Sequence, residues 1–405
     1  MLKDMSMRQL AFHSAARARR CGLGLTVAGM ALGVGMLLLG SAAAQPAACG
    51  TNLRVDRSMQ LEPGCRYTGS TVITGSNLVL DCRGATLDGD YKVVPVLRVG
   101  GDRMVSDVEI RNCVITGSRG SAVIIGLSAP DSRKPLGADG RPDPAQHPHR
   151  ITLRDVTVTR NSGVGIFVDD YVQDTSILNS TVENNAAVGI YLEHNSRRSR
   201  IANTRVARNG FGRKSGIPAA SNTSREGIAV DASADNIIEN NTISGNNQGG
   251  IFLYRNCGEQ PNNPDQVLRT QPATGNVIRD NVIEGGSLVG IAIASRQDMP
   301  VKPESCRLRV DAARGIYPDA APGNRVLGNT IRGVPVGIRV SDDGNVVEDN
   351  RISAARDCIR LGSQERNRLG HPIQDLIVRG NSCMEGRVNV LPETRMIQGN
   401  GPMTR

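Results

Sequence analysis

Residues 165–170 read Gly-Ile-Phe-Val-Asp-Asp, and residues 189–195 read Gly-Ile-Tyr-Leu-Glu-His-Asn. The phrase returns as Gly-Ile-Ala-Val-Asp at 227–231 and as Gly-Ile-Phe-Leu-Tyr-Arg-Asn at 250–256. Each copy begins with Gly-Ile, continues with a variable and an aliphatic residue, and ends in polar residues. Repetition every ~20–25 residues is typical of a solenoid, in which each coil stacks on its neighbours.

A second phrase alternates with the first. It reads Asn-Ile-Ile-Glu-Asn-Asn-Thr-Ile-Ser-Gly at 236–245 and Asn-Val-Ile-Arg-Asp-Asn-Val-Ile-Glu-Gly at 276–285. One Asn of this phrase recurs at a fixed turn position, which predicts a ladder of side-chain amides that bond along the stack. The predicted column holds Cys113, Asn241, Asn281, Asn329, Asn350 and Asn381.

The repeats predict short strands rather than helices. Ile166, Val168, Ile190 and Leu192 alternate with other residues, so we expect them to point inward. No stretch after residue 44 combines helical periodicity with capping residues. The chain has no Trp and only 2% aromatic residues, which suits a core built from columns of Ile, Val and Leu. We therefore predict an all-β fold, a single-stranded right-handed parallel β-helix.

The N-terminus reads as a secretory signal peptide. Three Arg residues precede an apolar stretch that ends in Ala42-Ala43-Ala44, a cleavage-like site. A membrane anchor is the alternative, but the apolar run is short for a span. We expect a periplasmic or secreted monomer without a membrane span after signal removal. The predicted divisions are a signal peptide at 1–44, an N-terminal cap at 45–70, a β-helix with cleft-forming insertions at 71–385 and a C-terminal tail at 386–405.

Eight cysteines remain after the expected cleavage, and an even count in an exported protein suggests disulfides. Nearest-neighbour pairing is favoured because each coil of a solenoid touches only adjacent coils. A zinc site is excluded, since the chain has no closely spaced Cys pairs. The predicted pairs are Cys49–Cys65, Cys82–Cys113, Cys257–Cys306 and Cys358–Cys383, of which Cys257–Cys306 would tie two loops of the cleft.

The charge of the chain suits an acidic ligand. Residues 1–44 carry five basic residues and one acidic residue, so they account for +4 of the formal net charge of +9 and leave +5. The basic residues are scattered and aromatic residues are few, which argues against nucleic-acid binding.

Stacking the Gly-Ile strands in register predicts three outward columns on one sheet. The columns are Phe167, Tyr191, Ala229 and Phe252; then Asp169, Glu193, Asp231 and Tyr254; then Asp170, His194, Ala232 and Arg255. Arg225 and Glu226 enter the same sheet just before Gly227. Insertions near 129–148, 210–223, 257–274 and 297–322 would wall this sheet into a cleft.

The residue types in these columns suggest a sugar site. Four of the ten Tyr and Phe residues lie here, and sugar rings favour flat apolar faces beside polar groups. His194, beside Glu193, is a candidate for proton transfer, although a surface His is often inert. Arg255 can also serve only as an ion-pair partner of an acidic neighbour. The Asp and Glu column can supply oxygen ligands to calcium.

These phrases resemble the repeats of pectin-lyase-like β-helix proteins, which include polysaccharide lyases, polyuronate epimerases and glycoside hydrolases. The resemblance covers about residues 70–385. Periplasmic alginate epimerases of this fold are taken to use a groove His as base and an Arg that neutralises a uronate carboxylate, and His194 and Arg255 match these roles. Polygalacturonases place an Asp pair, a His and an Arg on successive coils, an order that Asp169-Asp170, His194 and Arg255 follow.

The leading hypothesis is therefore C5-proton abstraction on an acidic polysaccharide, by a lyase or an epimerase. His194 would be the base or acid, with Tyr254 or Tyr191 as alternative, and Arg255 or Arg225 would face the carboxylate. The second hypothesis is polygalacturonase-like hydrolysis by a carboxylate pair, and the third is a non-catalytic polysaccharide-binding or envelope scaffold. The pair would be Asp170 with Asp169 or Asp231. The expected substrate-binding residues are Asp169, Tyr191, Glu193, Arg225, Glu226, Asp231 and Phe252.

Overall fold

The computed structural model describes residues 48–129, 135, 143–219, 224–255, 271–293, 321–368 and 370–397. They belong to one compact unit, residues 47–405. The expected signal peptide, the pair Cys257–Cys306 and most of the predicted insertions lie outside the described residues. Within them, strands pair only in parallel and form one 21-stranded and one 11-stranded sheet.

Each coil has three faces, which we number in chain order. Face 1 is the 11-stranded sheet: β3 (Met59–Gln60), β6 (Leu78–Asp81), β9 (Ser106–Arg111), β12 (His149–Arg154), β15 (Gln173–Leu178), β18 (Arg200–Ala202), β21 (Ile237–Glu239), β24 (Val277–Arg279), β27 (Arg325–Leu327), β29 (Val346–Glu348) and β31 (Ile377–Arg379). Face 2 contains β1 (Ala48–Thr51), β4 (Arg66–Thr68), β7 (Thr86–Asp88), β10 (Val114–Thr116), β13 (Thr157–Thr159), β16 (Thr181–Glu183), β19 (Arg205–Ala207), β22 (Thr242–Ser244) and β25 (Val282–Glu284).

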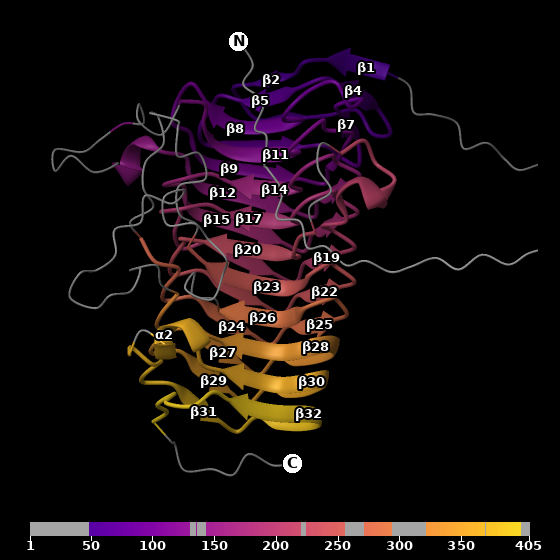
Figure 1. Ribbon diagram of the computed structural model, residues 1–405. Helices are drawn as coiled ribbons and strands as arrows, with labels where there is room; N and C mark the ends of the chain where they lie inside the picture. Colours follow the sequence, from indigo (N-terminus) through magenta and orange to yellow (C-terminus); the bar gives the residue numbers. More distant parts are fainter. Residues whose placement is uncertain are drawn as a thin grey trace, which may run out of the picture. The chain divides into compact units, whose positions relative to one another are not determined.

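Face 3 carries the Gly-Ile phrases. It contains β2 (Arg54–Val55), β5 (Thr71–Ile73), β8 (Leu97–Gly101), β11 (Val123–Leu127), β14 (Ile166–Val168), β17 (Ile190–Leu192), β20 (Ile228–Asp231), β23 (Gly249–Tyr254) and β26 (Val289–Ile293). Three long strands run through faces 2 and 3 together: β28 (Thr330–Val340), β30 (Arg351–Leu361) and β32 (Ser382–Val390). Figure 1 shows the arrows of face 3 stacked from β8 to β32. The described helices are short: η2 (Pro144–Gln146), η3 (Gly212–Ser215) and α2 (Gln364–Arg368).

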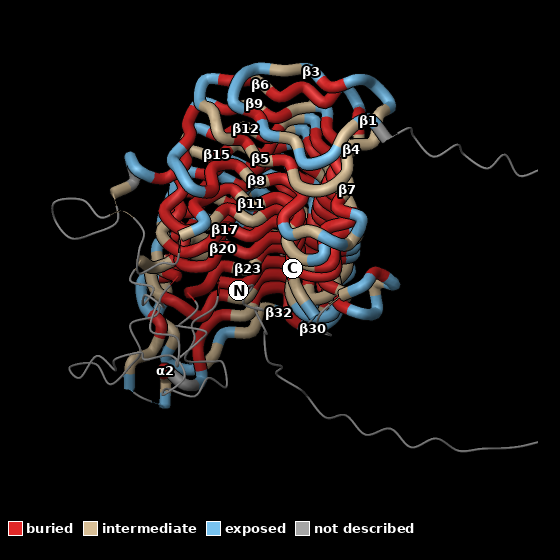
Figure 2. Tube along the Cα trace, turned by 90° about the horizontal axis from the view of Figure 1, so that it is seen from above, coloured by how far each residue is buried: buried red, intermediate tan, exposed pale blue. Residues whose placement is uncertain are grey.

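The core is a set of aliphatic columns inside the coils. Ile166 pairs with Ile190, and Val168 pairs with Leu192. All four side chains are 0% exposed, which confirms that they point inward. Figure 2, seen from above, shows buried positions in red along the inner course of the coils. Full burial of one such side chain contributes about 1.5–3 kcal/mol, and every coil adds several.

The Gly at the start of a Gly-Ile phrase lies too close to the next coil for a larger residue to fit. A Cβ on Gly250 would lie 2.4 Å from the carbonyl oxygen of Gly290 on the next coil. Such a contact is far shorter than van der Waals packing allows, so a larger residue here would push the coils apart.

Asparagine ladders run along the turns, as predicted. Asn281 donates from Nδ2 to Oδ1 of Asn329 at 2.9 Å and accepts from Nδ2 of Asn241 at 2.9 Å. Cys113 lies in the same column, because Val114 is in register with Thr242 through the strands between them. Two further ladders, absent from the sequence prediction, occupy other turns. They are Asn161–Asn185–Asn209–Asn246 and Asn236–Asn276–Asn324–Asn345.

Three of the four predicted disulfides are present. Their Cα–Cα distances are 5.6 Å for Cys49–Cys65, 4.9 Å for Cys82–Cys113 and 5.8 Å for Cys358–Cys383. Disulfides are typical of extracytoplasmic proteins.

The paired strands extend beyond the predicted β-helix bounds of 71–385. β1 pairs with β4 in the region expected to be a cap, and β32 continues to Val390. The stack therefore includes a coil at 48–68, because these residues supply the same parallel ladder as later coils.

Candidate active site

The first predicted column on face 3 is in register. Phe167 pairs with Tyr191, Tyr191 with Ala229, and Ala229 with Phe252. The rings of Phe167 and Tyr191 stack with their centroids 5.3 Å apart and their planes at 25°. Phe167 and Phe252 are half-buried, so parts of their rings face solvent. The column forms an apolar floor on the outer surface of the sheet, which we call the aromatic floor (Phe167, Tyr191, Ala229 and Phe252).

The two polar columns also follow the predicted register. Asp231 pairs with Tyr254, and the backbone N–H of Glu193 donates to Val168 O at 2.9 Å, which places Glu193 one rung from Asp169. In the third column, Ala232 N donates to Tyr254 O at 2.8 Å. Ala232 therefore stands level with the residue that follows Tyr254, which is Arg255.

The polar side chains are more buried than an open floor predicts. His194 is 2% exposed, Asp231 0% and Arg255 7%, whereas Asp169 and Arg225 are half-buried. A second apolar layer lies outside the sheet, and in it floor residues pack on residues that precede the Gly-Ile strands. This layer contains Val164, Ala187, Val188, Tyr191, Ala229 and Tyr254.

Two tyrosine–carboxylate pairs lie inside this layer. Tyr191 Oη donates to Asp231 Oδ2 at 2.5 Å, and Tyr254 Oη donates to Glu226 Oε1 at 3.0 Å. Burial raises the pKa of Glu226 above its usual range, although the nearby charge of Arg225 opposes the shift. Burial, together with the charges of Glu226 and Asp231, also raises the pKa of Tyr254 well above 10. The pair of Tyr254 and Glu226 thus favours bound protons and can act as a proton donor.

His194 lies in a cluster of its own. Its Nε2 is 3.2 Å from Tyr171 Oη, its Nδ1 is 3.8 Å from Asp170 Oδ2, and its backbone N–H donates to Glu193 Oε1 at 3.3 Å. The rings of Tyr171 and His194 meet edge to face at 5.2 Å, and His147 packs on the other side at 5.0 Å from Tyr171. A carboxylate on one nitrogen and a phenol on the other are the partners that orient a proton-transferring imidazole.

Tyr171 and His147 are not among the residues predicted from the sequence. Tyr171 directly follows Asp169 and Asp170, and this adjacency is the signal in the sequence that could have identified it. Its φ of 63° turns the chain, so that Tyr171 does not follow the alternating pattern of the strand. His147 belongs to an insertion, where the repeat offers no register.

Three arginines belong to the same coils of the stack as the polar and aromatic columns. Arg225 is half-buried beside Glu226, and Arg255 ends the third column. Arg98, one rung before Ile124 in the column of Phe167, was also missed. Burial lowers the pKa of Arg98, while the charges of Asp169 and Asp102 oppose that shift.

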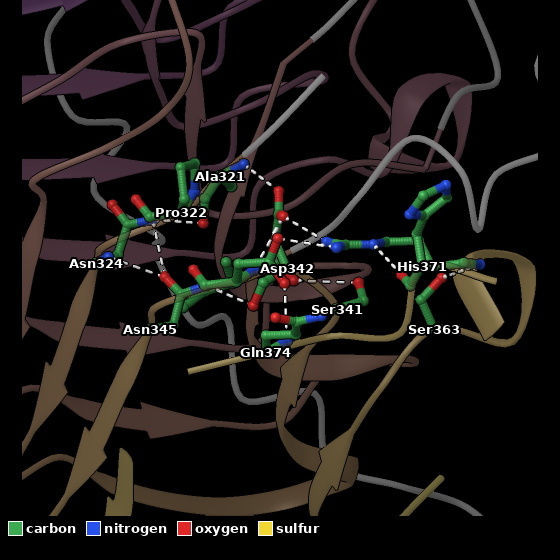
Figure 3. Close-up of polar contacts among 12 residues, drawn as sticks. Ala321, Pro322, Asn324, Ser341, Asp342, Asn345, Ser363, His371 and Gln374 are labelled. Carbon is green, nitrogen blue, oxygen red and sulfur yellow. Dashed lines mark hydrogen bonds and ion pairs between the residues drawn. The ribbon is translucent and has the colours of Figure 1, made fainter. Parts of the chain in front are cut away.

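A further buried ion pair involves Asp342, which the strand register places two rungs beyond Arg255. Arg366 donates from Nη1 to Asp342 Oδ1 at 3.0 Å and from Nη2 to Asp343 Oδ2 at 2.8 Å. Asp342 also accepts from the backbone N–H of Ala321 at 2.5 Å. Figure 3 shows Asp342 at the centre of this network, between Ala321 on one side and His371 on the other. Burial raises the pKa of Asp342 to about 6. The network fastens α2 and residues 321–324 to the stack.

Among the described residues, no group of three or more His, Cys, Asp or Glu side chains is arranged to hold a metal ion. The part of the chain that the structure describes also contains no helix long and apolar enough to cross a membrane.

Comparison with known proteins agrees with this architecture. Residues 97–266 match the family described as right handed beta helix region. Among solved structures, the periplasmic alginate epimerase AlgG is 14% identical with a TM-score of 0.57, over 88% of this chain and 77% of that one. The A-module of the mannuronan C-5 epimerase AlgE6 from Azotobacter vinelandii is 14% identical with a TM-score of 0.52, over 88% of this chain and 91% of that one. No curated protein sequence matches the chain.

At such identities the structural likeness concerns the fold and not the activity. Parallel pairing throughout, three faces per coil and aliphatic columns inside agree with the family match at 97–266. The chain is a right-handed parallel β-helix with the pectin-lyase-like fold.

Proposed function

We propose that this protein is an exported enzyme that acts on an acidic polysaccharide by abstracting the C5 proton of a uronate unit, as an epimerase or a lyase. The observation that carries the proposal is the juxtaposition, on consecutive coils of face 3, of proton-transfer groups, arginines and an aromatic floor. The structural neighbours whose names state an alginate or mannuronan epimerase activity support the same chemistry. Three disulfides support a periplasmic or secreted location.

The reaction needs a base beside the C5 proton and a cation beside the carboxylate group that is attached to C5. The base removes the C5 proton, and the electron pair moves into the uronate carboxylate, where a positive charge stabilises it. In an epimerase the electron pair returns to C5, which takes a proton on the opposite face. In a lyase the pair instead forms the C4–C5 double bond and expels the C4 oxygen, which takes up a proton from an acid.

The residues of face 3 can divide these roles. His194, held between Tyr171 and Asp170, is the proposed base. Arg255 or the more exposed Arg225 is the proposed cation for the carboxylate. The tyrosine–carboxylate pairs, with bound protons favoured at Tyr254 and Glu226, are the proposed acid.

A non-catalytic polysaccharide-binding role is the second candidate. The burial of His194 and Asp231, at 2% and 0% exposure, favours it, because a base must reach the proton that it removes. The half-buried rings of Phe167 and Phe252 would serve binding equally well without any chemistry.

A panel of polyuronates incubated with the protein in D₂O tests the proposal. Deuterium at C5 without chain cleavage would identify an epimerase, and ultraviolet absorption by a new C4–C5 double bond would identify a lyase. New reducing ends without that absorption would indicate hydrolysis, and binding without any product would favour the second candidate. Both of these results contradict the proposal.

The His194→Ala variant then tests the assigned base. We expect turnover to fall by about 10²–10⁴-fold, the usual contribution of a positioned acid or base, while binding is retained. His371→Ala is the matched control, since His371 joins the Asp342 network through its backbone carbonyl oxygen and not through its imidazole (Figure 3). Unchanged turnover in a His194→Ala protein that melts like the parent would remove this residue from the mechanism.

A further inference from the structure

His147 reaches the cluster around His194 from an insertion, and its side chain is fully buried. It is 0% exposed, and its ring centroid lies 5.0 Å from that of Tyr171, with the two planes at 55°. The ring of Tyr171 in turn meets that of His194 at 5.2 Å. Tyr171 therefore contacts two imidazoles, of which only His194 has a role in the proposed chemistry.

The three rings come from successive coils, at the turn between face 3 and face 1. His149 pairs with Gln173, and His147 and Tyr171 each lie two residues before these partners. Tyr171 N donates to His194 O at 3.3 Å, which places His194 in the next coil. The ring separations of 5.0 and 5.2 Å are close to the spacing of about 4.8 Å between coils. The three rings thus form a stack along the solenoid, which we call the ring stack (His147, Tyr171 and His194).

Tyr171 adopts a backbone conformation that a bulky residue seldom takes. Its φ of 63° lies in the left-handed region. Such a conformation persists only where the surrounding contacts compensate for its cost, and it recurs at functional sites. Tyr171 makes contacts of this kind at both ends of the ring stack, through its bonds to His194 and through its ring contact with His147.

The backbone on both sides of His147 is fixed by hydrogen bonds. Before it, the carboxylate of Asp143 accepts from Gln146 Nε2 at 2.9 Å and from a backbone N–H of η2 at 2.9 Å. After it, Pro148 O accepts from Gln173 N at 3.3 Å, where the chain enters β12. A segment that is fixed on both sides presents the imidazole in one position.

The position of the Tyr171 ring decides whether its hydroxyl reaches His194. Tyr171 Oη and His194 Nε2 are 3.2 Å apart, so a displacement of the ring by about 1 Å would break the contact. Removal of the His147 ring would open space beside Tyr171 for such a displacement.

We propose that His147 is a positioning residue for proton transfer: its buried ring holds Tyr171 against His194, so that the imidazole of the base keeps its orientation. The inference rests on the proposed function in one respect, that His194 is the base. The role requires a flat ring at position 147 and no titration of His147.

Nitrogen-15 NMR of histidine-labelled protein tests the positioning directly, because the imidazole shifts report the tautomer and the hydrogen bonds of each ring. Tyr171→Phe, which keeps the ring and removes the hydroxyl, should move the resonances of His194. His147→Ala should move them in the same direction. His147→Phe, which replaces one flat ring by another, should leave them unchanged, and His194→Ala assigns them.

Turnover on a polyuronate that the parent converts gives the second measurement. His147→Ala should lower kcat by about 10–100-fold, the scale expected for a group displaced by about 1 Å, and change KM by less than about twofold. Tyr171→Phe should lower kcat as well. The double variant should be no slower than the slower single variant, because both changes remove the same contact. Losses that multiply in the double variant would overturn the proposal.

Gln146→Ala is the matched control, because it changes the exposed neighbour of His147 in η2 and leaves the ring stack intact. Resonances of His194 that are as unaffected by His147→Ala as by this control would overturn the proposal, whatever the turnover. If His147→Ala melts at a lower temperature than the parent, His147→Phe decides instead. A shift of the His194 resonances in His147→Phe as large as that in Tyr171→Phe would also overturn the proposal.

The outcomes separate the positioning role from the proposed function. Coupled changes at His194 in a protein that converts no polyuronate would support the positioning and contradict the proposed chemistry. Turnover that requires His194 and is unchanged in His147→Ala would contradict the positioning role alone. Full turnover in a well-folded His194→Ala protein would overturn both.

Discussion

Replacement of Asn281 by Ala tests whether the asparagine ladders hold the coils together. The side chain makes four hydrogen bonds: Nδ2 donates to Ile238 O and to Asn329 Oδ1, each at 2.9 Å, and Oδ1 accepts from N and Nδ2 of Asn241 at 3.0 and 2.9 Å. All of these groups are buried, so water cannot replace the amide. At about 1 kcal/mol for each bond, the loss of stability should be about 4 kcal/mol.

Equilibrium urea unfolding followed by far-UV circular dichroism measures the global loss. Because a solenoid can unfold in parts, hydrogen exchange of the peptide around Asn241 should be measured as well, and its backbone N–H should exchange faster. Thr242→Ala is the control, since this neighbouring side chain is exposed and its removal should change stability by less than about 0.5 kcal/mol. A loss in Asn281→Ala no larger than in the control would refute the proposed contribution of the ladder.

Three further predictions concern stability. Because burial raises the pKa of Asp342 to about 6, above 3.8 in its ordinary state, its stabilising contribution is present below about pH 4 and lost as the pH rises through 6; Asp342→Asn should flatten that slope in urea titrations, and an unchanged slope would contradict the assignment. Removing the disulfide Cys82–Cys113 by double Ala substitution should lower the free energy of unfolding by about 3–4 kcal/mol, because the bond joins residues 31 positions apart. Thermal melts of the parent and the variant measure this loss, and an unchanged melting temperature would contradict it. Gly250→Ala should prevent close stacking of adjacent coils, because its Cβ would meet a carbonyl oxygen at 2.4 Å; a normal yield of stable protein would show that the coils can adjust.

The sequence predicted what the repeat controls. The columns of Phe167 and Asp231, the ladder through Asn281 and three disulfides follow from one rule, that equivalent residues of successive coils are neighbours. The rule relates only adjacent coils, so a wrongly placed residue in one coil does not change the predicted neighbours in the others.

The sequence could not predict what the repeat leaves free. His147 reaches Tyr171 from an insertion, which has no periodic register. His194 is 2% exposed, and its ring meets that of Tyr171, a residue whose position the repeat does not specify. Alternation tells that a side chain points outward, but not whether other side chains cover it.

The stack also fixes distances along face 3 in whole coils. Arg339 and Arg360 occupy successive long strands, and both strands carry the complete pairing pattern of faces 2 and 3. Duplication of the coil that contains β28 would therefore lengthen face 3 by about 4.8 Å and repeat Arg339 once more, without a single point mutation. Deletion of that coil would bring the remaining Arg one step closer to Phe252. A gene encoding such a protein can thus change the length of face 3 by recombination in units of one repeat, whereas point mutations change only the residues that face 3 presents.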